Sequence, residues 1–196
     1  MTRLSTQERK EQIAIAILEI IGNEGLENLS MPALAKRLDI VPSALYRHFS
    51  SKEEMISAGL DLLRERIMGI FDQQESDSDD ALEPLRRFLD LHRQFFHITT
   101  VFPRIAFSLA DNETFDLRRQ KMQRFHDTVL ERISATLEKG RRNGQLRKNL
   151  DTSAAALSFW GILVSSTLRW FITGGDFDVE AYKKEAWDMF VRAVSI

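Results

Sequence analysis

Residues 30–52 contain side chains suited to binding DNA. Arg47 carries a guanidinium that can form paired hydrogen bonds with the guanine edge in a major groove. Ser43 and Ala44 lie shortly before it, and their small side chains would let a helix approach the base edges closely. Further residues could bind the phosphate backbone through a hydroxyl, imidazole or ammonium group, or at a helix N-terminus: Ser30, Tyr46, His48 and Lys52.

The residue types needed for catalysis or metal binding are not arranged in a recognisable site. The chain has four histidines, and no Glu-x-x-His motif for a di-iron site occurs, because the residues three positions earlier are Leu45, Leu89, Gln94 and Gln123. The absence of cysteine excludes disulfides and thiolate metal sites. No glycine-rich phosphate loop or nucleophile motif is present. We therefore expect neither an enzyme nor a bound metal or cofactor.

Net charge does not account for an affinity for nucleic acid. The chain carries a formal charge of -2, and residues 1–60 contain seven Lys and Arg against eight Asp and Glu. Such a chain has no general electrostatic attraction to DNA. Any DNA binding must therefore depend on where the basic groups are placed, and hence on the helices that carry them.

Four helices are expected to position the candidate residues: Thr6–Asn23, Met31–Leu38, Pro42–Phe49 and Ser51–Phe71. The first has isoleucines at helical spacing, which indicates one buried stripe. Ser30 is placed as the N-cap of the second, Asp39 occupies the tight turn that follows, and Pro42 suits the first turn of the third. Leu45 and Phe49 would face inward. Two short helices joined by a tight turn behind a longer helix form a helix-turn-helix domain.

An acidic segment without apolar residues, from Asp72 to Asp80, separates this part from the rest of the chain. Beyond it the apolar spacing predicts five more helices, at about 81–98, 102–110, 113–140, 152–173 and 179–195. The expected fold is all-α, with about nine helices. A helix-turn-helix domain (1–50) would be joined by a long connecting helix (51–73) to a helical-bundle ligand-binding and dimerisation domain (81–196).

The larger predicted domain is rich in aromatic side chains, because only two of the 18 aromatic residues lie in residues 1–60. Packing explains most of them. So many rings in a helical bundle also suit a cavity for a small apolar or aromatic ligand. The residues predicted to line it are Phe95, Phe102, Phe107, Phe125 and Phe159.

The stretch of residues 152–168 carries no charged side chain. A membrane span would need more length and fewer hydroxyl groups, so we expect a buried central helix and no membrane association. Small residues at helical spacing on this helix would let another helix approach closely, and a two-fold interface of four helices is expected in a homodimer. The predicted interface residues are Ala154, Ser158, Gly161 and Ser165, with Ala186 and Phe190 and their neighbours Tyr182, Met189 and Ala193 from the last helix.

The run from Leu34 to Met55 resembles the TetR family of bacterial transcriptional regulators, most specifically at Leu45–Glu53 (Leu-Tyr-Arg-His-Phe-Ser-Ser-Lys-Glu). A weaker match, Gly144–Asp151, resembles the family's link into its penultimate helix. The resemblance implies a homodimeric repressor that places the third helix of each subunit in a major groove of a palindromic operator. A small ligand bound in the larger domain would release the DNA. The DNA-contacting positions that it implies are Ser30, Ser43, Ala44, Tyr46, Arg47, His48 and Lys52.

Two positions depart from the family's pattern. Asp39 stands where glycine is usual in the turn, although aspartate tolerates the left-handed conformation. Val41 stands where serine or threonine usually precedes the recognition helix, and a valine side chain neither caps a helix nor bonds a phosphate. The operator contacts are therefore expected to differ here from those of relatives.

Other functions of the same fold remain open. An activator, or a regulator that needs its ligand in order to bind DNA, would carry the same motifs. A protein-binding module that uses a helix-turn-helix only for packing would also suit the near-neutral first domain. A cytoplasmic location is expected, because Met1–Gln12 lacks the apolar segment of a signal peptide.

Overall fold

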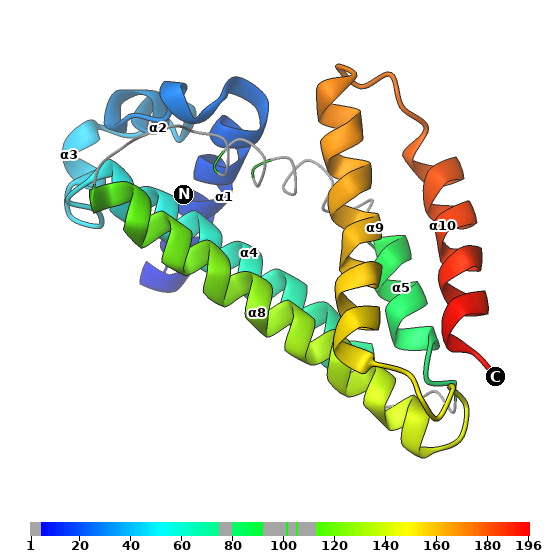
Figure 1. The fold of residues 1–196 in the computed structure, drawn as a ribbon. Helices are drawn as coiled ribbons and strands as arrows, with labels where there is room; N and C mark the ends of the chain where they lie inside the picture. Colours follow the sequence, from blue (N-terminus) through cyan, green and yellow to red (C-terminus); the bar gives the residue numbers. More distant parts are fainter. Residues whose placement is uncertain (1–4, 75–79, 92–100, 102–104, 106–112) are drawn as a thin grey trace. The chain divides into compact units, whose positions relative to one another are not determined.

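The computed structural model describes residues 5–74, 80–91, 101, 105 and 113–196. In these ranges the chain is helical, and an isolated bridge between Leu146 and Ser195 is its sole β feature. The elements are α1 (Thr6–Glu24), the 3₁₀ turn η1 (Leu26–Asn28), α2 (Met31–Arg37), α3 (Pro42–Leu45), α4 (Lys52–Gln74), α5 (Glu83–Leu91), α8 (Glu113–Arg142), α9 (Thr152–Ile172) and α10 (Val179–Val194) (Figure 1). The predicted all-α fold is confirmed. The predicted helix at 102–110 lies outside the described residues, apart from Ile105.

The described residues form two compact units. The first contains those of residues 1–66 and 97–123, and the second contains those of residues 67–96 and 124–196. The helices α4 and α8 contribute residues to both units. The division of the chain into domains 1–50, 51–73 and 81–196 remains a prediction.

The first unit has an apolar core built on the predicted stripe of α1. Ser5 begins this helix with a capping box: its Oγ accepts a hydrogen bond from the Glu8 amide (3.2 Å), and the Glu8 carboxylate accepts one from the Ser5 amide (2.7 Å). The helix α2 packs on both α1 and α3. The isoleucines of the stripe are all buried: Ile13, Ile17, Ile20 and Ile21.

The helix α4 lies close against α1 at Gly59. A Cβ atom at this position would be 3.1 Å from Leu18 and 3.2 Å from Ile17. The two helices are also joined by an ion pair between Arg66 and Glu11 (3.3 Å). Glycine therefore permits the close approach that fixes α4 against α1.

Two helix ends differ from the prediction. The helix α3 ends at Leu45 rather than near Phe49, because the His48 amide bonds the Leu45 carbonyl (2.8 Å) across three residues, which tightens the chain into a turn. The helix α4 continues to Gln74, into the segment predicted as an acidic loop. Its last two residues are glutamines, whose helix propensity is higher than that of aspartate, so the helix continues past Asp72.

Aromatic rings form the core of the second unit. Phe159 of α9 is fully buried and lies 6.3 Å from Phe88 of α5 and 5.5 Å from Phe190 of α10, measured between ring centroids. Phe71, near the end of α4, stacks on Phe88 at 4.4 Å. A buried lysine, Lys183 of α10, donates a hydrogen bond to the Leu89 carbonyl in the last turn of α5 (3.0 Å). The aromatic contacts and this hydrogen bond together join α5 to α9 and α10.

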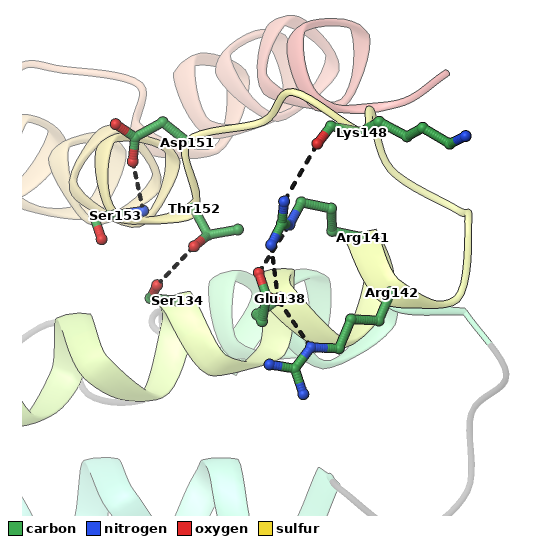
Figure 2. A network of polar contacts seen from close by, with 8 residues as sticks. All are labelled: Ser134, Glu138, Arg141, Arg142, Lys148, Asp151, Thr152 and Ser153. Carbon is green, nitrogen blue, oxygen red and sulfur yellow. Dashed lines mark hydrogen bonds and ion pairs between the residues drawn. The ribbon is translucent and has the colours of Figure 1, made fainter.

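A polar network holds the connection between α8 and α9 (Figure 2). Asp151 caps α9 by accepting hydrogen bonds from the Ser153 and Ala154 amides, each at 3.0 Å. Arg141 donates to the Glu138 carboxylate (2.9 Å) and to the Lys148 carbonyl (3.3 Å). Arg141 therefore links the end of α8 to the segment that leads into α9.

Glu138 accepts hydrogen bonds from both Arg141 and Arg142, and these bonds lower the pKa of its carboxyl from 4.5 to about 2. Because folding lowers this pKa, the resulting stabilisation is present above about pH 4.5 and is lost as the pH falls toward 2. We expect a carboxyl ¹³C NMR titration to show a midpoint for Glu138 near 2 in the wild type and nearer 4.5 in an Arg141→Gln, Arg142→Gln double variant. Lys139→Gln is the control, because it removes a neighbouring charge without removing either bond. A wild-type midpoint near 4.5 would contradict the network.

Candidate nucleic-acid interface

The segment from α2 to α3 has the geometry of a helix-turn-helix. Ser30 is the N-cap of α2, and its Oγ accepts a hydrogen bond from the Ala33 amide (3.3 Å). Asp39 adopts the left-handed conformation of the turn, with φ of 51°, and the Ile40 amide closes it by bonding the Ala35 carbonyl (3.0 Å). Aspartate thus takes the role usually given to glycine, as the sequence predicts.

The exposed face of α3 and the turn after it carries the predicted DNA contacts. Leu45 and Phe49 are buried, as their spacing predicts. Ser43 and Arg47 are exposed, and Tyr46 has 62% of its surface accessible. The structure therefore brings the small, aromatic and basic residues of this segment to the surface.

The remaining candidates lie beside this face. Ala44 and His48 are half-buried, and the His48 ring lies 6.4 Å from the ring of Phe49. Lys52 is half-buried at the first position of α4. The position before α3 is Val41, which forms no side-chain cap and is exposed beside Pro42.

Residues 1–60 carry almost no net charge, but their basic side chains differ in whether they are paired with acids. Arg37 pairs with Glu19 (2.9 Å) and Glu24 (3.3 Å) of α1. Arg47, by contrast, forms no hydrogen bond or ion pair with any residue that the structure describes. At least five acidic side chains in the described part of residues 1–60 have partners in ion pairs or helix caps: Glu8, Glu11, Glu19, Glu24 and Glu54.

The start of α4 shows how one of these acids is used. The Ser51 hydroxyl accepts a hydrogen bond from the Glu54 amide (3.2 Å), so Ser51 caps this helix. The Glu54 carboxylate in turn accepts from the Ser50 amide, and this backbone hydrogen bond lowers the pKa of Glu54. Its negative charge is therefore held at the N-terminus of α4, where the helix dipole favours it.

Two family models match the sequence. The model of the tetR family of bacterial regulatory proteins matches residues 13–58, and the model of the tetracyclin repressor-like C-terminal domain matches residues 78–194. The second match alone spans more than half of the 196 residues. The chain belongs to the TetR family. Members of the TetR family are DNA-binding transcriptional regulators, so this protein is a regulator and not an enzyme, as predicted.

TetR-family relatives match along nearly the whole chain. The nucleoid occlusion factor SlmA of Marinobacter nauticus is 24% identical over 95% of this chain and 95% of its own length. A TetR transcriptional regulator from Chloroflexus aurantiacus has a TM-score of 0.80 at 17% identity, over 97% of this chain and 98% of its own. FadR from Bacillus subtilis, solved in complex with stearoyl-CoA, has a TM-score of 0.73 at 19% identity, over 92% and 96%. These structures share the TetR fold with this chain.

The predicted ligand-binding phenylalanines of this TetR-family chain are placed in part. Phe125 of α8 is buried, with its ring centroid 6.2 Å from that of Trp160. Phe159 is fully buried among the rings of α5 and α10. Phe95, Phe102 and Phe107 lie outside the described residues. Phe125 and Phe159 thus belong to one aromatic core, and their contact with a ligand stays a prediction.

The predicted dimer stripe lies on an exposed face of α9. Ala154, Ser158 and Ser165 are exposed, while Gly161 is half-buried. The serine hydroxyls bond carbonyls of their own helix, Ser158 to Ala154 (2.9 Å) and Ser165 to Gly161 (2.6 Å). Because these polar groups already have partners, the face can be covered by another apolar surface without losing hydrogen bonds.

On α10, the predicted interface residues differ in burial. Ala186 is half-buried and Met189 is 65% exposed, beside the α9 face. Phe190 is only 6% exposed, because its ring packs on Phe159 and Trp187 within the same chain, which leaves little of it to contact a second chain.

Two large apolar residues of the exposed face were missed by the sequence analysis. Leu157 is 54% exposed and Val164 is also exposed. They lie three positions after Ala154 and Gly161, so helical spacing from the small residues could have identified them. Within the described ranges, α9 is the one helix long and apolar enough to cross a membrane by length and composition alone, a test that the core helix of a soluble protein also passes.

Proposed function

We propose that this regulator is a cytoplasmic homodimeric repressor, which binds a palindromic operator and releases it when a small, apolar or aromatic ligand binds the larger domain. The observation that carries the proposal is the exposed face of α3. In the turn after this helix, Arg47 presents a guanidinium that has no partner among the described residues, while at least five acids of residues 1–60 are held in caps and ion pairs.

The residues around α3 divide by the part of DNA that they suit. Arg47 is placed to bond a guanine edge, and small Ser43 and Ala44 permit the approach that this bond requires. The exposed side chain of Val41 suits contact with a thymine methyl group. The residues assigned to phosphate groups are Ser30, Tyr46, His48 and Lys52.

The occupant proposed for the exposed face of α9 and α10 is a second copy of the chain. Apolar Leu157 and Val164 lie on the same face of α9 as the small residues of the stripe, and Met189 is exposed on α10, which packs against α9. This arrangement suits close packing of helix on helix. A two-fold axis through this face would join two copies of α9 and α10 in a four-helix interface. The dimer would present two α3 segments to consecutive major grooves, whose centres lie roughly 34–36 Å apart.

The larger domain is proposed to bind the ligand among its aromatic rings. The complex of Bacillus subtilis FadR with stearoyl-CoA shows that a protein of this fold binds a ligand that carries a long apolar acyl chain. The helix α4 carries Lys52 at its start and Phe71 near its end, where Phe71 stacks on Phe88. A ligand that moves this ring pair would shift α4 and change the separation of the α3 segments in the dimer. Measuring that separation in liganded and DNA-bound dimers tests the mechanism, and equal separations would contradict it.

Selection from a random DNA library tests the proposed function. We expect the full chain to enrich a palindromic site and to bind it with two chains per site. Fluorescence anisotropy should show log K falling linearly with log salt concentration, because phosphate contacts release counterions. Transcription in vitro from a promoter that contains the site should fall as the site is occupied, whereas an activator would raise it. Failure to enrich any sequence, together with no salt-dependent binding, would favour a protein-binding module instead.

A further inference from the structure

Trp160 of α9 has an indole N–H without a hydrogen-bond partner. The residue is 7% exposed, and its Nε1 atom has no acceptor in the part of the chain that the structure describes. The other two tryptophans, Trp170 and Trp187, are half-buried, so Trp160 is the most deeply buried of the three. Since buried donors in folded proteins are nearly always bonded, an unbonded one requires an explanation.

The indole ring of Trp160 lies among aromatic rings from two other helices. The Trp160 ring lies 6.5 Å from Phe88 of α5, and 6.2 Å from both Phe125 and His126 of α8, measured between centroids. Phe88 and Phe125 offer no polar side-chain group. The ring of His126, which is half-buried, packs edge to face against the indole at an interplanar angle of 75°.

A water molecule is a poor partner for this donor. A buried water is held by two to four polar groups, and here two of the three neighbouring rings supply none. This site requires an acceptor for the indole N–H and an apolar surface against the neighbouring rings. An apolar molecule with a single acceptor oxygen supplies both, because its hydrocarbon part packs on the rings while its oxygen accepts from the indole. A carboxylate fits less well, because a buried anion needs a cationic partner and the indole N–H is neutral.

We propose that Trp160 Nε1–H donates a hydrogen bond to the effector, and that the effector is a neutral, largely apolar or aromatic molecule carrying a carbonyl oxygen. This inference rests on the proposed function of a ligand-released regulator and specifies its ligand class. Phe88 and Phe125, which pack near the indole, supply apolar contacts to the ligand. The Trp160 N–H distinguishes a ligand that has the oxygen from one that lacks it.

Matched pairs of compounds test the proposal on the full-length protein. Acetophenone and α-methylstyrene differ by a carbonyl in place of a methylidene group, and 2-nonanone and 2-methyl-1-nonene form a longer pair of the same kind. We expect a ketone to bind the wild type at least about five-fold more tightly than its alkene, the amount typical of one hydrogen bond. The indole N–H resonance of Trp160, assigned as the one that both Trp170→Phe and Trp187→Phe retain, should move downfield only with the ketone.

The variants separate the hydrogen bond from general packing. Trp160→Phe should remove the preference for the ketone and retain affinity for the alkene, whereas Trp187→Phe, which alters another ring of the same core, should keep the preference. The wild-type shift of the indole resonance decides the matter even where a variant does not fold. Equal binding of ketones and alkenes, no binding by either ketone, or a preference that survives in Trp160→Phe would each overturn the proposal. Operator binding is also measured without ligand. Absence of operator binding would contradict the proposed function, whereas operator binding without a preference for ketones would contradict only the ligand class.

Discussion

Replacing Arg47 by alanine should weaken operator binding by about 5- to 150-fold, the range for loss of one paired contact to a guanine. The size of the effect follows from the position of Arg47, which is exposed on the recognition segment and unpaired within the described structure. Its removal therefore deprives the DNA of a partner without leaving an acid unpaired in the protein. Fluorescence anisotropy with the selected operator measures the loss, and circular dichroism should show unchanged helix content.

Arg86→Ala is the matched control for this prediction. It removes the same charge from an exposed position on α5, in the second compact unit, so it should change operator affinity little. Relaxed discrimination at one base pair of the operator would identify the contact as a base contact, since a phosphate contact weakens binding to all sequences alike. If Arg47→Ala and Arg86→Ala reduced affinity equally, Arg47 would have no specific role in reading DNA.

Replacing Gly161 by arginine should weaken dimerisation by about 100-fold or more, because it would bury an unpaired charge at the centre of the proposed interface. A Cβ atom at Gly161 meets nothing within 4 Å in the single chain, so the larger side chain fits the protomer. Arginine also favours helix more than glycine does, and the fold of α9 should persist. Analytical ultracentrifugation should show a monomer where the wild type is a dimer.

Gly69→Arg provides the control for the dimer prediction. Gly69 is also a helical glycine with open space around its Cβ position, but it lies on α4. We expect this variant to remain dimeric. Dimers of Gly161→Arg that are as stable as the wild type would place the interface elsewhere on the chain.

Helices were predictable from the sequence where a cap and an apolar stripe agree. Asp151 caps α9, two glycines follow Thr173, and the prediction of 152–173 lies within one residue of the observed Thr152–Ile172. The ends of α3 and α4 were less predictable. At α3, Leu45 and Phe49 keep the spacing of a buried helical stripe although the chain tightens into a turn after Leu45. Periodicity alone therefore does not show where the regular helix ends.

In the candidate sites, too, helical spacing predicts which residues are exposed but not which residues they contact. Helical spacing was enough to place Leu45 inward and Arg47 outward. Spacing does not determine which surface covers a residue, so Phe190 was assigned to the interface although it packs on Phe159, and Leu157 was not assigned to it although it is exposed. The pairing of Arg37 with two acids of α1, and the unbonded N–H of Trp160, depend on residues distant in sequence and had no local signal.

The side chains of the α3 face have a consequence for how this protein can diverge. Folding of the first unit depends on buried residues such as Leu34 and Leu45, whereas Ser43, Tyr46 and Arg47 project from the surface. Substitutions at these three positions can therefore change which operator is recognised at little thermodynamic cost to the fold. A few exposed substitutions in this segment can therefore change the DNA sequence that is recognised, while the buried core of the first unit stays unchanged.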